Sequence, residues 1–209
     1  MRSVEENEWA SLEYWNPEIL LTRLFPLKVI SQSRNQPKRI RHWNAQPLKK
    51  YKEQEQAALF CYCVNELGRV GEPFEVAMAP RRDADYDCVI RQKGTEGHFE
   101  FRPVQLKEWV PQEVNPTATL QGLLEELRTR YPVSKRLLVA VFINRDVVFD
   151  LSQVRIQPLT VEQVWLYRLK QENQIAVNAF RSDGERIDRA LPYPQLRIDL
   201  LRPGRELGS

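Results

Sequence analysis

The sequence predicts a single α/β domain, and three observations support this class. The chain has 209 residues, which suits one domain with extensions. Hydrophobic residues make up 42% of it, enough for a substantial core, and charges of both signs are interspersed. Between residues 49 and 145 the apolar periodicity changes from helical to strand-like and back. This change predicts the order helix, three strands, helix, strand.

The first helix is expected over residues 48–67, with Gly68 as its C-cap. Its apolar side chains recur at the spacing of one helix face, at Ala57, Phe60, Cys61, Val64 and Leu67. A strand is expected next over 74–79, because Phe74, Val76 and Met78 alternate with polar or small residues.

Two further strands are expected over 86–91 and 98–109, joined by a glycine-containing reverse turn over 92–97. Such a short connection predicts an antiparallel hairpin. Pro103 interrupts the alternation of the later strand and lacks an N–H for the ladder, which predicts a bulge or an edge position there.

The second helix is expected over 118–131, with Thr117 as its cap and Pro132 at its end. The continuous apolar run over 136–143 is typical of a strand that is buried on both faces.

The domain organisation follows from these elements. Residues 1–48 form an N-terminal extension with a short helix over 18–25 and a basic loop, residues 49–145 form the core, and residues 146–209 form a C-terminal α/β extension of the same domain. In that extension we expect strands over 147–151, 175–180 and 196–201, and a helix over 160–171 that opens with a capping box.

A basic segment, residues 33–52, contains seven cations and no acid. It carries +7 in a chain whose net charge is +3, which leaves the remainder at −4. Such a concentration favours a polyanionic partner, although a solvated loop would have the same composition. The candidate nucleic-acid-binding residues are Arg34, Lys38, Arg39, Arg41, Lys49, Lys50 and Lys52.

The cysteines and apolar runs predict a cytoplasmic protein without a membrane partner. Cys61, Cys63 and Cys88 have no metal-ligand spacing with either histidine, so we expect reduced core thiols. Residues 1–13 contain no apolar leader segment, and the apolar run 137–143 is far too short to span a bilayer.

Three polar residues fall within the expected hairpin. Asp87 lies at the start of one strand, and Gln105 and Lys107 lie two apart near the end of the other, on the same face. An antiparallel hairpin brings these ends together. Oxygen ligands for a divalent cation and an ammonium group beside a phosphate are what metal-dependent phosphodiester hydrolysis requires.

These residues and the element order resemble the PD-(D/E)XK nuclease superfamily over residues 49–143, with Gln105-Leu106-Lys107 similar to its QxK variant. The resemblance implies a restriction-endonuclease-like αβββαβ core with a mixed central sheet flanked by helices. It implies Mg²⁺ or Mn²⁺ bound by Asp87, the Gln105 side-chain oxygen and the Leu106 carbonyl. Lys107 would then activate water and stabilise the charge of the transition state.

The superfamily often adds an acid from the first helix, for which Glu53 and Glu55 are the candidates, and helical phase favours Glu53. This chain departs from the family pattern because it has no Pro-Asp dipeptide and has glutamine where an acid is usual. Asp83 or Asp85 could take the place of Asp87, although the apolar run after Asp87 favours that residue.

The resulting hypothesis is a metal-dependent endonuclease or exonuclease that hydrolyses DNA phosphodiester bonds. A homodimer is a possible arrangement, since many such nucleases pair to cut two strands. The first alternative is a catalytically degenerate nuclease-fold protein that binds nucleic acid or a protein without cleavage. The second is an interaction protein without a nucleic-acid role.

Overall fold

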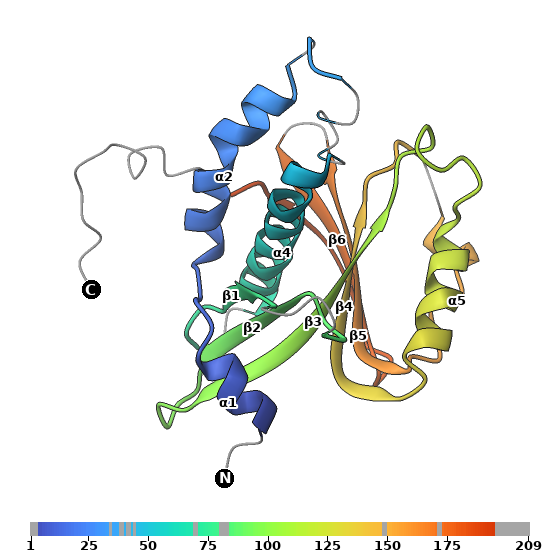
Figure 1. Cartoon of the computed structure of the whole chain (residues 1–209). Coiled ribbons are helices and arrows are strands. Elements are labelled where there is room, and N and C mark those ends of the chain that lie inside the picture. Colours follow the sequence, from blue (N-terminus) through green and yellow to red (C-terminus); the bar gives the residue numbers. More distant parts are fainter. Residues whose placement is uncertain are drawn as a thin grey trace, which may run out of the picture. The chain divides into compact units, whose positions relative to one another are not determined.

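The computed structural model describes residues 4–33, 35–37, 40, 43, 45–68, 71–79, 84–147, 150–170 and 173–194. These residues form a mixed α/β structure with a seven-stranded sheet (Figure 1). Its helices are α1 (Val4–Ala10), α2 (Pro17–Ser31), α4 (Gln46–Gly68) and α5 (Leu120–Arg130), with a 3₁₀ turn at Leu151–Gln153. Its strands are β1 (Glu75–Met78), β2 (Cys88–Lys93), β3 (Phe99–Trp109), β4 (Ser134–Ile143), β5 (Val161–Lys170), β6 (Gln174–Arg181) and β7 (Arg186–Pro192).

The strands lie in the sheet in their chain order, from β1 to β7. β4 pairs in parallel with both β3 and β5, whereas the β5–β6 and β6–β7 pairs are antiparallel. A parallel pair needs a crossover, and α5 supplies it between β3 and β4. The predicted order helix, three strands, helix, strand is therefore present as α4, β1, β2, β3, α5 and β4.

The β2–β3 connection is the antiparallel hairpin that the sequence predicts. The Gly94 N–H donates to the His98 carbonyl at 2.8 Å, and the Asp87 N–H donates to the Val104 carbonyl at 2.9 Å. The residue number of the acceptor rises as that of the donor falls, so the two strands run in opposite directions. Gly97 has a φ of 78°, a conformation that glycine adopts without strain.

Pro103 does not place β3 at the edge of the sheet, because β3 lies between β2 and β4. The pairing with β4 begins at Val104, directly after the proline, so the missing N–H falls where that ladder has not yet started. The alternation fails for another reason. Four consecutive residues, Pro103 to Leu106, are buried, so both faces of β3 are covered there.

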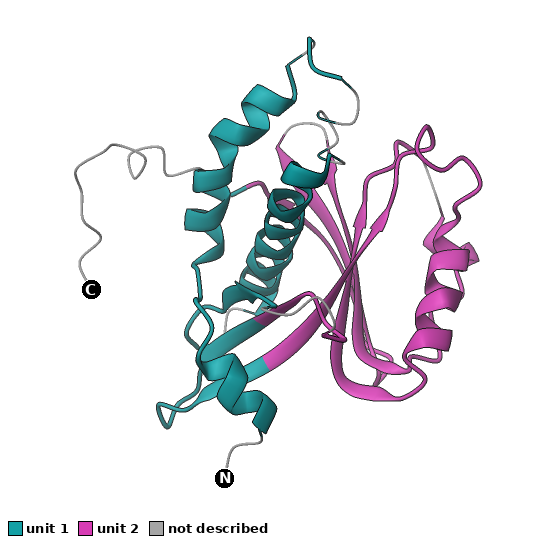
Figure 2. Ribbon diagram, in the orientation of Figure 1, with its two compact units in different colours: residues 1–80, 90–101, 194–209 teal, residues 81–89, 102–193 magenta. Residues whose placement is uncertain are grey.

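The chain divides into two compact units, coloured separately in Figure 2. Unit 1 comprises residues 1–80, 90–101 and 194–209, and unit 2 comprises residues 81–89 and 102–193. Two of the divisions along the chain, between residues 89 and 90 and between residues 101 and 102, fall within β2 and β3.

The core of unit 1 is built around α4. Its middle residues Ala57, Phe60 and Cys61 are fully buried, and the helix packs against α2 and β1. The Asn65 side chain joins α4 to the start of β1, because it donates to the Phe74 carbonyl at 3.0 Å and accepts the Phe74 N–H at 2.7 Å.

The core of unit 2 lies between α5 and the sheet. The buried face of α5 packs on side chains from β3, β4 and β5, among them Trp109, Val139 and Leu166. The apolar residues that α5 contributes are Leu120, Leu124 and Leu127. Its N-cap is Thr119, whose hydroxyl accepts the Gly122 N–H at 3.0 Å, so the prediction of Thr117 as the cap was wrong.

The C-terminal region differs most from the prediction. Residues 161–170 form strand β5, so the predicted helix over 160–171 was wrong. The predicted strand over 147–151 is also wrong in its described part, where a 3₁₀ turn begins at Leu151. The strand over 175–180 is confirmed as β6, and residues 196–201 lie outside the described part of the chain.

The N-terminal region is more helical than predicted. The helix expected over 18–25 extends over 17–31 as α2 and runs through Pro26, and α1 was not foreseen. None of the three cysteines forms a disulfide and all three are buried, as predicted. Burial raises the pKa of the Cys61 and Cys63 thiols, which keeps both protonated and unreactive at neutral pH.

Candidate metal centre

Asp87 is fixed against β3 by both its main chain and its carboxylate. Its N–H pairs with the Val104 carbonyl, and its Oδ2 accepts the Leu106 N–H at 2.7 Å. Alternate residues of a strand direct their N–H groups to the same neighbour, so Val104 and Leu106 both face the β2 side. The Asp87 carboxylate therefore accepts the next β2-facing N–H of β3, just before β2 begins.

Gln105 connects Asp87 to Leu106 and Tyr131. Its side chain is buried, and its Nε2 donates both to Asp87 Oδ2 and to the Leu106 carbonyl, the latter at 3.2 Å. Its Oε1 accepts the Tyr131 hydroxyl at 2.6 Å. Two oxygen atoms, one from a carboxylate and one from the main chain, thus converge on a single amide nitrogen.

Tyr131 holds the other end of the amide. It is the buried C-cap residue of α5, and its N–H donates to the Leu127 carbonyl at 2.9 Å. Burial raises its pKa, against the opposing effect of the Arg130 guanidinium, and the negative charges of Asp85 and Asp87 raise it further. The phenol therefore keeps its proton at neutral pH and is able to donate.

Lys107 lies two residues after Gln105 on β3, on the same face of the strand. Its ammonium group is 3.8 Å from a carboxylate oxygen of Glu126 on α5. The Lys107 side chain is 21% exposed and that of Glu126 is 68% exposed, so the pair lies at the solvent boundary. A pair of this kind holds the lysine only weakly.

The structure brings Asp87, Gln105 and Leu106 together within unit 2, where Lys107 also lies, and it adds Tyr131, which the sequence places only at the end of a helix. No local sequence pattern marks Tyr131 as part of this group. Its place depends on how α5 packs against β3, across 26 residues of sequence.

The two candidate helix acids, Glu53 and Glu55, lie on α4 in unit 1. Glu55 forms a largely buried ion pair with Lys28 of α2, which gives this carboxylate a structural partner. Glu53 lies 3.7 Å from Lys49, one turn earlier on α4, and is 40% exposed.

The basic segment is only partly described. Arg34, Lys38, Arg39 and Arg41 lie outside the described residues. Of the three remaining cations, all in α4, Lys49 and Lys50 are exposed and Lys52 is half-buried. The Lys50 ammonium lies 4.8 Å from the centre of the Tyr51 ring. Asp83, an alternative to Asp87, also lies outside the described residues.

The residues at Asp87 fit a hard divalent cation. Mg²⁺ and Mn²⁺ prefer oxygen ligands, and Asp87 Oδ2 and the Leu106 carbonyl already share one positively polarised partner. The Gln105 amide carries a third oxygen, which would face the same point if the amide were turned over. In the described part of the chain, no group of three or more His, Cys, Asp and Glu side chains is arranged to hold a metal ion. The fit therefore depends on this mixed set of ligands.

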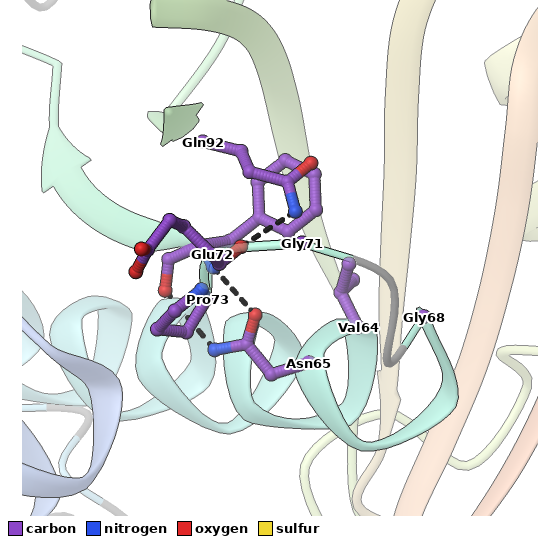
Figure 3. A pocket seen from close by; sticks show the side chains of 8 residues that line it. Val64, Asn65, Gly68, Gly71, Glu72, Pro73 and Gln92 are labelled. Atoms are coloured by element: carbon purple, nitrogen blue, oxygen red, sulfur yellow. Dashed lines mark hydrogen bonds between the residues drawn. The ribbon is translucent and has the colours of Figure 1, made fainter. Parts of the chain in front are cut away.

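A small pocket lies elsewhere, in unit 1 (Figure 3). Its volume is about 110 Å³, below the usual size of ligand pockets. The Gln92 amide donates to the Glu72 carbonyl at 2.5 Å, and the Asn65 amide donates to the Phe74 carbonyl. These polar side chains therefore connect parts of the pocket wall to one another. None of the predicted site residues lines it.

Comparisons of the chain with protein-family models, with curated proteins and with solved structures gave no significant match. Among the residues described, no helix is both long enough and apolar enough to cross a membrane.

Proposed function

We propose that this protein is a metal-dependent nuclease that hydrolyses DNA phosphodiester bonds, on a core of the restriction-endonuclease type. One observation carries the proposal. Asp87 Oδ2 and the Leu106 carbonyl both accept from the Gln105 amide nitrogen, so the two oxygens surround one point, and Lys107 follows Gln105 on the same face of β3. Hydrolysis of a phosphodiester needs this combination of oxygen ligands and a nearby ammonium group.

The element order supports the same proposal. A hairpin followed by a helical crossover to a parallel strand, β2–β3–α5–β4, is the arrangement that the resemblance to PD-(D/E)XK nucleases implies. The position of the candidate ligands on that hairpin also agrees with it. The metal at such a site would be Mg²⁺ or Mn²⁺.

Each residue has a distinct task in this reaction. Asp87, Gln105 and Leu106 would hold the cation, which when bound supplies Lewis-acid chemistry to the phosphate and to the attacking water. The Lys107 ammonium adds positive charge where negative charge develops on the phosphate oxygens. The exposed Lys49 and Lys50 are suited to contact phosphates of the DNA backbone.

Replacing Lys107 tests the proposal directly. We expect Lys107→Ala to lower the rate of Mg²⁺-dependent DNA cleavage by about a hundredfold or more, because charge stabilisation at the phosphate is lost. The measurement is the initial rate on supercoiled plasmid and on linear duplex, with circular dichroism to verify folding. Lys93→Ala, at the exposed end of β2, is the matched control and should cleave normally. A Lys107→Ala protein with the wild-type rate would refute the proposed reaction.

The second candidate is a degenerate nuclease fold that binds nucleic acid without cutting it. The observation that favours it is the Gln105 amide, which directs a nitrogen rather than an oxygen at Asp87. This candidate requires DNA binding that weakens with salt and no turnover with Mg²⁺ or Mn²⁺. Turnover that Lys107→Ala abolishes would exclude it.

A further inference from the structure

The Gln105 amide is held at three points, and the two partners of its nitrogen are the proposed metal ligands. Its Nε2 donates to Asp87 Oδ2 and to the Leu106 carbonyl, and its Oε1 accepts from Tyr131 at 2.6 Å. Asp87 is half-buried, and its carboxylate oxygen is stabilised by a positively polarised partner, which the Gln105 amide N–H groups supply. The amide nitrogen thus gives these two oxygens a positively polarised partner, as a bound cation would.

We propose that Gln105 is a displaceable ligand of the Asp87 site, whose amide nitrogen stands in for the cation and whose amide turns over about Tyr131 when a divalent cation binds. This inference rests on the metal site proposed above and adds a role for one of its residues. Once turned, the amide presents Oε1 to the cation and Nε2 to Tyr131. The same side chain then serves both states of the site.

Tyr131 is the positioning residue that makes both orientations acceptable. A neutral phenol hydroxyl both donates and accepts hydrogen bonds. It donates to Oε1 while the amide nitrogen faces Asp87, and it accepts from Nε2 once the oxygen faces the cation.

Glutamine and glutamate differ sharply at this position. A glutamate would place a second carboxylate against Asp87, and like charges at such short range oppose each other until a cation separates them. Among the described residues, the charged or titratable groups that act at this position include Asp85 and Asp87 before β2, and Arg130 and Tyr131 at the end of α5. Lys107, on the same face of β3, pairs with Glu126. Glutamine therefore favours a site that is stable without metal and binds metal weakly.

The test compares wild type with Gln105→Glu, in EDTA and in Mn²⁺, by thermal unfolding and titration calorimetry. In EDTA we expect Q105E to unfold several degrees below wild type, because its paired carboxylates repel. We expect Q105E to bind Mn²⁺ at least about tenfold more tightly, because no amide must be displaced and one more charge is offered. Gln153→Glu, an exposed Gln-to-Glu change, should alter neither property. A Q105E protein that matches wild type in both properties would overturn the inference.

Two further variants separate this inference from the metal site itself. Asp87→Asn should abolish Mn²⁺ binding, and unchanged binding would refute the site, whatever Q105E shows in EDTA. Tyr131→Phe should lower the unfolding temperature both in EDTA and in Mn²⁺, and change the Mn²⁺ affinity by less than about threefold, because both orientations lose one hydrogen bond. A change of tenfold or more would show that Tyr131 serves only one orientation and would overturn its role as pivot.

Discussion

At the scale of single residues, Asp87 has a structural task besides its proposed catalytic one. Its Oδ2 accepts both the Leu106 N–H and the Gln105 amide, and both donors are buried or nearly so. We expect Asp87→Ala to lower the free energy of unfolding by about 1–3 kcal/mol, because buried donors that lose a partner also lose their compensation for leaving water. Urea denaturation measures this change.

The control for Asp87 is an acid of the same hairpin with little contact to the core. Glu96 is exposed in the β2–β3 turn, so Glu96→Ala should change the stability by less than about 0.5 kcal/mol. If Asp87→Ala were as stable as Glu96→Ala, the hydrogen bonds at Asp87 would contribute nothing to folding. The carboxylate would then serve the proposed site alone.

The candidate site could be predicted only where it depends on local spacing. Gln105 and Lys107 share a face because strands have a period of two, and Asp87 comes opposite them because a short glycine turn makes a hairpin. Tyr131 follows from neither rule. Its contact with Gln105 depends on the packing of α5, which the sequence does not encode in any short pattern.

At the scale of elements, α5 begins at a cap that sequence reasoning placed two residues too early. Thr119 accepts the Gly122 N–H, whereas the Thr117 hydroxyl is bonded to Asn115 in the preceding turn. We expect Thr119→Ala to lower the free energy of unfolding by about 1 kcal/mol through loss of the cap. Thr117→Ala is the matched control, and a larger loss from this control would show that the helix is capped from the earlier turn.

The misread element β5 shows where local signals fail. Thr160 and the following residues resemble a capping box, but residues 161–167 contain two valines, a tryptophan and a tyrosine, which favour a strand. The segment forms a strand rather than a helix because it pairs with β4 on one side and with β6 on the other. β7 was missed although Asp183-Gly184 is a hairpin signal, and Gly184 indeed has a φ of 91°.

At the scale of the whole molecule, the proposed contact with DNA depends on the uneven distribution of charge. The net charge of +3 is too small to hold DNA, so any binding must use a local group of cations. The basic segment is the best such group in the sequence, and Lys49 and Lys50 are its exposed members on α4. Both proposed functions, cleavage and binding alone, need this contact.

Salt dependence measures that contact without requiring turnover. Each lysine that neutralises a phosphate adds about 0.9 to the slope of log affinity against log salt concentration, because a condensed counterion is released. We therefore expect the double variant Lys49→Ala, Lys50→Ala to lower the magnitude of the slope by about 2, measured by fluorescence anisotropy with duplex DNA in EDTA. The variant Lys93→Ala, Lys135→Ala removes the same charge from exposed strand positions and should leave the slope unchanged. Equal slopes for the two variants would mean that only the overall charge matters, and the basic segment would then be a solvated loop rather than a DNA contact.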